Sequence, residues 1–355
     1  LNPEVIEVMC EQLRDNFGNP SSTHEYGRKA RVLLESTRKQ IATSFRCSPS
    51  QVLFTSGGSE ADNLVLQNAA RHWGIKRFIS SEIEHHAVLH ALDAIKKDND
   101  ITVDYVRTNT FGEVDMEHLE ELLQSSAVPC LVSLMMVNNE IGNLLNVSAV
   151  SALCKEHGAL FHSDTVQGIG HVAFNLEETP IDFIAASAHK FNGPKGVGFA
   201  IVPKGTHIEP LIHGGEQEMG TRAGTENTHS IAGMGKALQM ALDNFETERE
   251  YVSGLKQYFI DELKSSFKEI EFNGRSADPE KSAFHILSAR FPKEIPMLLF
   301  NLDLNGISAS GGSACQSGSN KGSHVLSAIL DEKESEKTSV RFSFSKHNTR
   351  QEIDR

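Results

Sequence analysis

Short apolar runs alternate with amphipathic stretches along the chain between about residues 51 and 202. Seven of the runs are four to seven residues long and rich in Val, Ile, Leu and Phe, which predicts β-strands. Helical patterns such as Val147–His157 separate several of them. The predicted strands are Gln51–Thr55, Arg77–Ser80, Ile101–Val106, Leu131–Val137, Ala159–His162, Ile181–Ala186 and Val197–Val202. Strands separated by helices form βαβ units, so we predict an α/β fold with a mainly parallel seven-stranded sheet flanked by helices.

The remainder of the chain has a different pattern. A long helical stretch, His229–Phe267, precedes a strand at Phe284–Phe291, a helix at Ile295–Leu302 and a last strand at Thr338–Phe344. This order is typical of a smaller α+β unit. We therefore predict a large domain over residues 1–245, and a small domain over residues 246–355 against which residues 1–12 pack.

Charge and cysteine content narrow the function classes. The 355 residues include 34 basic and 47 acidic side chains, and the net charge of −13 argues against a nucleic-acid-binding protein. The apolar runs are too short to cross a bilayer, so no membrane association is expected. The five cysteines are scattered and form no CxxC pair, which favours a reducing, cytoplasmic compartment over a disulfide framework or a zinc site. They are Cys10, Cys47, Cys130, Cys154 and Cys315.

A glycine-rich turn follows the first predicted strand. Gly57, Gly58 and Ser59 come directly after Gln51–Thr55 and precede a helical pattern. Backbone N–H groups of glycines at a helix N-terminus bind anions well, and Ser59 adds a hydroxyl donor. A tight turn with Ser59 as helix cap is the alternative interpretation. The turn is not a Walker A loop, because no Gly-Lys-Ser/Thr follows.

Polar side chains also follow four other predicted strands. A ring-bearing residue, His85 or His86, follows the second strand, while Asn139 follows the fourth, Asp164 the fifth and Lys190 the sixth. Ligands of such sheets bind at the carboxyl ends of the strands, so these groups are expected to share one site. Each taken alone is also consistent with a cap or turn residue. A lysine, a carboxylate and an anion-binding turn together suggest pyridoxal phosphate, which requires a Schiff-base lysine, a partner for its ring nitrogen and donors for its phosphate.

With these residues in place, the sequence resembles the cysteine desulfurases of the iron–sulfur cluster assembly (NifS-like) type, within the fold-type I pyridoxal phosphate transferases and their class V aminotransferase group. The resemblance covers nearly the whole chain and consists of many short motifs in the family's order. They are Phe17-Gly18-Asn19-Pro20-Ser21-Ser22, Thr55-Ser56-Gly57-Gly58-Ser59-Glu60, Glu84-His85-His86-Ala87-Val88, Val137-Asn138-Asn139-Glu140-Ile141-Gly142, Asp164-Thr165-Val166-Gln167, Ser187-Ala188-His189-Lys190, Gly193-Pro194-Lys195-Gly196, Gly214-Gly215-Glu216-Gln217-Glu218, Arg222-Ala223-Gly224-Thr225, Gly312-Ser313-Ala314-Cys315 and Val340-Arg341-Phe342-Ser343.

The resemblance implies a set of cofactor contacts. Lys190 would form the Schiff base and shuttle protons, Asp164 would pair with the ring nitrogen, and Gln167 would bond the ring hydroxyl. His85 would stack on the ring and act as an acid or base, and Asn139 would also contact the cofactor. The phosphate would be held by Gly58, Ser59, Ser187 and His189, and by Thr225 from the second subunit of a homodimer.

The resemblance also implies the chemistry. Asn139 and Arg341 would bind the carboxylate of L-cysteine, and the Cys315 thiolate would take its sulfur as a persulfide, leaving L-alanine. The loop around Cys315 resembles the subgroup with a long, mobile loop, which passes sulfur to an iron–sulfur scaffold or another acceptor protein. In some members of that subgroup the same cysteine transiently ligates a [2Fe-2S] cluster on the partner.

Three alternatives remain from the sequence. Selenocysteine lyase activity uses the same residues, whereas another fold-type I aminotransferase would not need the thiol of Cys315. A non-catalytic assembly scaffold is disfavoured because Lys190, Asp164, His85 and Cys315 are all present. The family's opening Asp-Asn-x-Ala-Thr-Thr motif does not occur after Leu1, which we attribute to a trimmed end, and Gly58-Ser59 stands where many members have Ala-Thr.

Overall fold

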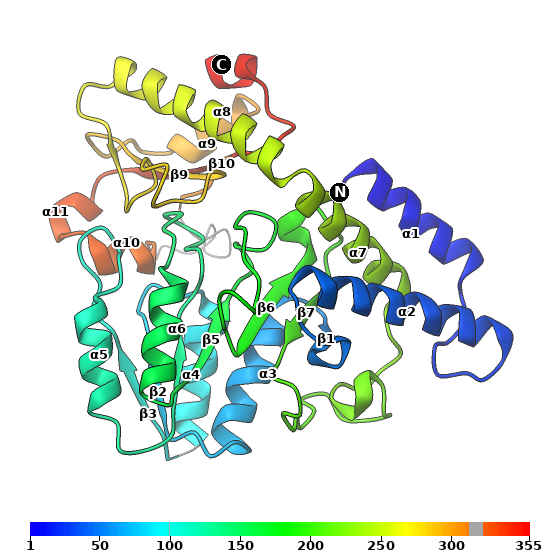
Figure 1. Ribbon diagram of the computed structural model, residues 1–355. Helices are drawn as coiled ribbons and strands as arrows, with labels where there is room; N and C mark the ends of the chain where they lie inside the picture. The colour runs from blue at the N-terminus through cyan, green and yellow to red at the C-terminus, as the bar shows by residue number, and fades with distance from the viewer. Residues whose placement is uncertain (99, 312–321) are drawn as a thin grey trace.

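A seven-stranded sheet forms the centre of the larger part of the molecule (Figure 1). The computed structural model describes residues 1–98, 100–311 and 322–355. The strand order is β1-β7-β6-β5-β4-β2-β3, and β7 runs antiparallel to both of its neighbours while the other pairs are parallel. The strands are β1 (Val52–Thr55), β2 (Arg77–Ser80), β3 (Thr102–Tyr105), β4 (Cys130–Ser133), β5 (Leu160–Asp164), β6 (Phe183–Ser187) and β7 (Gly198–Ile201). The predicted mainly parallel sheet is confirmed.

Helices cover both faces of this sheet because successive strand residues point to opposite sides. Leu53 packs in a cluster with α3 and α4, whereas its neighbour Phe54 packs in the cluster that includes α2, α6 and α7. Phe78 and Ile79 divide between the same two clusters. The helices of this part are α1 (Pro3–Asp15), α2 (Glu25–Ser44), α3 (Gly58–Arg71), α4 (His86–Asp98), α5 (Met116–Gln124), α6 (Val147–Glu156) and α7 (Thr228–Asp243), with 3-10 turns η1 (Pro49–Gln51), η2 (Ala188–Phe191) and η3 (Glu218–Gly220).

A second, three-stranded antiparallel sheet has the order β10-β9-β8 and packs with α8 around a smaller apolar cluster. Figure 1 shows α8 extending from the end of α7 across this sheet. Its elements are α8 (Phe245–Ser266), β8 (Glu271–Phe272), β9 (Ile286–Arg290), α9 (Leu298–Leu304), α10 (His324–Ile329), α11 (Glu332–Ser335), β10 (Ser339–Ser343) and α12 (Arg350–Asp354). The domain boundary predicted after residue 245 falls at the junction of α7 and α8, and stays a prediction.

The N-terminal segment differs from its prediction. Residues 1–12 were expected against the small domain, but α1 packs on α7. The reason is its apolar face: Val5 is fully buried in the main core, and Met9 lies so close to Gly233 of α7 that a Cβ there would be 2.7 Å from its Cγ. Glycine at position 233 thus permits the close approach of the two helices. Among the described residues, no helix is both long and apolar enough to span a membrane.

Candidate active site

The carboxyl ends of β4, β5 and β6 meet at one edge of the large sheet, and polar residues cluster there. Asp164 and Ser187 are the last residues of β5 and β6, and Lys190 lies in the turn η2 immediately afterwards. The turn ends at Asn192, whose left-handed φ of 65° reverses the chain. This edge adjoins a cavity of about 240 Å³ between the two sheets. Its lining includes Asn139, Gln167, His189, Lys190 and Arg341, five of the predicted site residues.

The carboxyl group of Asp164 is buried at the end of β5. Burial, and then the neighbouring carboxyl of Asp62, raise its pKa to about 8. A hydrogen bond of 2.9 Å from the Val166 amide to Asp164 Oδ1, and then the effects of His162 and Lys190, oppose this rise. The group is therefore mostly protonated at neutral pH. A cationic ligand nitrogen beside it would lower the pKa and restore the carboxylate.

Further buried polar groups lie behind Asp164. Burial raises the pKa of Asp62 to about 8 and lowers that of His162 to about 4, so their 3.4 Å contact joins two neutral groups at pH 7. His162 Nδ1 and the Ser133 hydroxyl are 2.8 Å apart. Burial also raises the pKa of Glu84 well above its ordinary value. These groups come close to Asp164 only when the sheet is folded, and the sequence pattern did not identify them.

The glycine-rich turn lies against the ends of β5 and β6. An added Cβ at Gly57 would be 3.3 Å from the Ser187 hydroxyl, and one at Gly58 would be 2.4 Å from Val166 Cγ2. Both positions thus require glycine for close backbone approach. The Ser187 hydroxyl lies 2.9 Å from His189 Nδ1. The α3 N-terminus therefore lies beside this pair, and helix N-termini of this kind can bind an anion. Phosphate binding at this cradle of donors stays a prediction.

His85 is held in a fixed orientation before α4. Its Nδ1 accepts a hydrogen bond of 3.1 Å from the Ala87 amide, so a neutral ring carries its proton on Nε2. Burial, and then the nearby His86 and Lys190 charges, lower the pKa of His85 to about 4. His85 is therefore a neutral imidazole at physiological pH. Such a ring can stack on a ligand and accept a proton.

Arg341 of the small sheet contacts the polar edge of the large sheet. Its guanidinium donates to the Asn139 carbonyl oxygen at 2.9 Å, and the buried Asn139 Oδ1 has no hydrogen-bond partner within the described residues. The backbone of Arg341 also pairs with Ser310, at 3.1 Å for the amide of Ser310 and 2.6 Å for that of Arg341. Ser310 lies shortly before the predicted nucleophile, Cys315, which is outside the described residues.

Thr225 and the four described cysteines do not line the cavity. Thr225 is exposed in the loop before α7. Cys10 is exposed, whereas burial raises the pKa of Cys47 and Cys130 to about 11 and that of Cys154 to about 12. These three thiols are protonated at neutral pH, which makes them poor nucleophiles.

The structure adds two residues that the sequence interpretation missed. His171 and His285 line the cavity and stack with ring centroids 3.8 Å apart. His171 lies four residues after Gln167, but His285 is remote in the sequence and belongs to no motif. Only the fold could bring it here.

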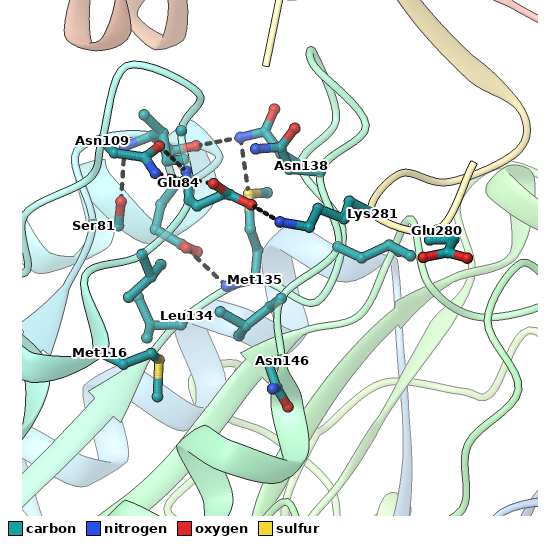
Figure 2. Close-up of a pocket in the computed structure, with 17 residues that line it drawn as sticks. Ser81, Glu84, Asn109, Met116, Leu134, Met135, Asn138, Asn146, Glu280 and Lys281 are labelled. Carbon is teal, nitrogen blue, oxygen red and sulfur yellow. Dashed lines mark hydrogen bonds and ion pairs between the residues drawn. The ribbon is translucent and has the colours of Figure 1, made fainter. Parts of the chain in front are cut away.

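A second cavity, of about 650 Å³, lies near the β2–α4 and β3–α5 connections and is drawn in Figure 2. Most of its polar groups bond to one another. Glu84 accepts from the Met135 amide and Asn138 donates to Met135 Sδ (Figure 2). Lys281 also pairs with Glu113. This cavity contains none of the predicted catalytic residues. The smaller one is therefore the candidate active site.

The comparisons with known proteins all indicate the same family. The aminotransferase class-V profile matches residues 1–355. The chain is 38% identical to a protein named cysteine desulfurase IscS from Dictyoglomus turgidum, over 99% of this chain and 89% of that one. It is also 38% identical to cysteine desulfurase IscS from Clostridium botulinum, over 99% and 88%. A solved structure named NifS-like protein superposes with a TM-score of 0.91 at 33% identity, covering 100% of this chain and 93% of the other.

Proposed function

Since this chain belongs to the aminotransferase class-V family, we propose that it is a cysteine desulfurase that converts L-cysteine to L-alanine with the help of pyridoxal phosphate. The sulfur passes through Cys315 to an acceptor protein for iron–sulfur cluster or related biosynthesis. The observation that carries the proposal is the cavity that joins Lys190 and Arg341, at the sheet edge where Asp164 is buried.

The residues of this site fit pyridoxal phosphate. Lys190 supplies the amine, the cradle at Gly58 and Ser59 with Ser187 and His189 receives the phosphate, and Asp164 receives the ring nitrogen. The buried carboxyl of Asp164 is suited to a cationic partner, because that partner would offset the cost of its burial. When bound, the cofactor draws electrons away from the α-carbon of an amino acid. His85 provides a neutral ring for its face, and Gln167 provides donors for its hydroxyl.

Arg341 and Asn139 orient the substrate. A guanidinium binds a carboxylate through two parallel hydrogen bonds, and the Asn139 carbonyl fixes the Arg341 side chain at the cavity wall. Lys190 lines the same cavity and can take and return the α-proton. The geometry thus favours a small amino acid that carries its reacting group on the β-carbon.

The thiolate of Cys315 attacks the substrate sulfur, the S–S bond forms as the C–S bond breaks, and a persulfide remains on Cys315. The electron pair of the broken bond stays with the substrate carbon, which takes up a proton to give L-alanine. The β-pairing of Ser310 with Arg341 supports this role, since it fixes one end of the Cys315 segment beside the substrate-binding arginine. The persulfide is then available to a scaffold or other acceptor, and Cys315 could serve there as a transient [2Fe-2S] ligand.

The enzyme acts as a homodimer in which Thr225 contacts the phosphate of the partner's site. The exposure of Thr225 and of large apolar side chains such as Phe17 and Val32 supports a subunit interface. A cytoplasmic location is supported by the four described cysteines, which form no disulfide.

The test is a paired assay of alanine and sulfide formed from L-cysteine in the presence of a thiol reductant. We expect equal amounts of both products, loss of both in Lys190→Ala, and loss of persulfide and sulfide in Cys315→Ser with cofactor still bound. Cys47→Ser, which removes a partly buried thiol, is the matched control and should stay active. Bound cofactor without either product from L-cysteine would reject the proposal.

A further inference from the structure

A pair of stacked imidazoles forms one wall of the active-site cavity. His171 lies in the turn after β5, and His285 lies immediately before β9. Their rings are nearly parallel, with an angle of 23° and centroids 3.8 Å apart. His285 is buried, and both rings line the cavity together with Lys190 and Arg341. The proposed reaction so far assigns neither ring a role.

The His285 ring contacts the side chain of Gln167. His285 Nε2 lies 3.3 Å from Gln167 Oε1. Because a carbonyl oxygen can only accept a hydrogen bond, Nε2 must carry the proton. With Oε1 occupied in this way, the two N–H donors of the Gln167 amide remain for a ligand. The contact therefore determines which end of the amide faces the cavity.

The ring pair stays neutral. Burial, and then the adjoining His171 ring and three cationic side chains, lower the pKa of His285 well below its ordinary value. Burial lowers the pKa of His171 to about 4, against the opposing effect of the Gln167 backbone carbonyl. The charged or titratable groups that act on His285 are His171, Lys256, Lys190 and Arg341. A neutral His285 keeps a single Nε2 proton at physiological pH, so its bond to Gln167 has a fixed direction.

We propose that His285 is a positioning residue that orients the Gln167 amide so that its N–H donors bind the ring oxygen of pyridoxal phosphate. The inference rests on the proposed function, because it requires that cofactor in this cavity. His171 supports the arrangement by stacking on the His285 ring. The donors stabilise negative charge on the ring oxygen, most strongly when the nitrogen that links Lys190 to the cofactor has lost its proton.

The test is a pH titration of the visible absorption band of the bound cofactor. His285→Phe keeps an aromatic ring against His171 but removes the N–H donor. We expect its titration midpoint to rise by about one pH unit. Gln167→Ala should give the same rise, and the double variant no further rise, because both changes remove one interaction. His285→Gln, which restores an N–H donor, should return the midpoint toward the unaltered value. His171→Phe, which leaves the Gln167 side chain untouched, should not move it.

An unchanged midpoint in His285→Phe, or additive shifts in the double variant, would overturn the inference. A second measurement needs no variant to fold: nitrogen NMR of the unaltered holoenzyme labelled at histidine must show His285 with its proton on Nε2. A proton on Nδ1 would also overturn it. Absence of any visible cofactor band in the unaltered protein would instead reject the proposed function, so the two failures are distinguishable.

Discussion

Asp164 is a buried side chain whose surroundings oppose its ionisation. In the protein without cofactor its pKa is about 8, well above the ordinary value for a carboxyl group, chiefly because of burial. Because the pKa of Asp164 is raised in the folded protein, its protonated form stabilises the folded state at a pH below the ordinary carboxyl pKa. This stabilisation is lost as the pH rises through about 8, the pKa in the folded protein. The cofactor-free protein should therefore lose stability toward pH 8. The cofactor's ring nitrogen would reverse this effect by pairing with the carboxylate.

The loss of stability with rising pH gives the first prediction. Asp164→Asn keeps the acceptor for the Val166 amide but removes the ionisation. At pH 8 the cofactor-free variant should be more stable than the unaltered protein, by about 2 kcal/mol. With cofactor added, the order should reverse, and desulfuration should fall at least about 100-fold. Urea unfolding at pH 5 and pH 8 measures the first effect, with the exposed Asp261→Asn as control. Equal stability of the two cofactor-free proteins at pH 8 would contradict the assignment.

The sequence predicted which residues gather at the sheet edge when their place depends only on where a strand ends. Lys190, Asp164 and Asn139 follow three strands whose ends must meet, so an edge site could be inferred from order alone. His285 could not be inferred in this way, because its contact with Gln167 joins residues 118 positions apart in the chain. The same limit applies to Asp62 and His162, whose contact exists only within the packed layers.

At the scale of elements, the start of α3 is fitted to the turn after β5. An alanine at position 58 would place its Cβ 2.4 Å from Val166 Cγ2, and a β-branched side chain has little freedom to move. We predict that Gly58→Ala weakens pyridoxal phosphate binding about tenfold by displacing the turn. The double change Gly58→Ala with Val166→Ala should restore affinity.

The control for this prediction is Gly254→Ala, on α8, where an added Cβ meets no atom within 4 Å. It should leave affinity unchanged. Equilibrium titration of the cofactor checks all three variants. If Gly58→Ala and the double variant bind pyridoxal phosphate with equal affinity, the contact with Val166 is not what limits cofactor binding.

Helix α8 is held to the segment that crosses between the sheets by a buried lysine. Lys256 Nζ donates to the Ser282 hydroxyl and to the Ala283 carbonyl oxygen, each at 2.9 Å. Burial lowers its pKa to about 7. Between about pH 7 and pH 10 the unfolded chain therefore binds more protons than the folded one, and stability should rise with pH across this interval.

We predict that Lys256→Met removes this rise. The free energy of unfolding of the unaltered protein should increase between pH 6.5 and pH 9 by about 2 kcal/mol more than that of the variant. Urea unfolding at the two pH values measures the difference. Lys264→Met, which removes an exposed lysine of the same helix, should behave like the unaltered protein. If Lys256→Met kept the full rise of stability with pH, the rise would have to come from another titrating group.

The elements themselves were predictable to different degrees. Buried strands such as β2 showed a run of apolar residues, and its predicted bounds, Arg77–Ser80, agree with the structure. β4 ends at Ser133, four residues before the predicted end. Leu134–Val137 are buried, but the only strand-like pairing assigned there among the described residues is an isolated bridge from Val137 to Leu144. The two-residue β8 was missed, since so short a strand carries no periodicity.

At the scale of the whole molecule, a single copy of the chain has large apolar side chains exposed on its surface. Phe17 and Val32 are 68% and 69% exposed, on or beside the first two helices, and Phe17 stacks on Tyr26 at 5.2 Å. Surface of this kind is typical of a subunit interface. The sequence pattern predicted the two sheets, but an interface depends on how exposed side chains of two copies fit together. Only the resemblance to the desulfurases indicated a dimer.

The last prediction tests whether Thr225 completes the partner's site. In a mixed dimer of a Lys190→Ala chain and a Thr225→Ala chain, the single site that keeps its lysine receives an intact threonine from the partner. In a mixed dimer of an unaltered chain and a chain with both changes, that site receives alanine. At limiting pyridoxal phosphate, the first dimer should be about tenfold more active per remaining lysine, because it keeps a hydrogen bond to the phosphate. The opposite order would place Thr225 in its own chain's site, and a monomer in sedimentation would exclude a shared site altogether.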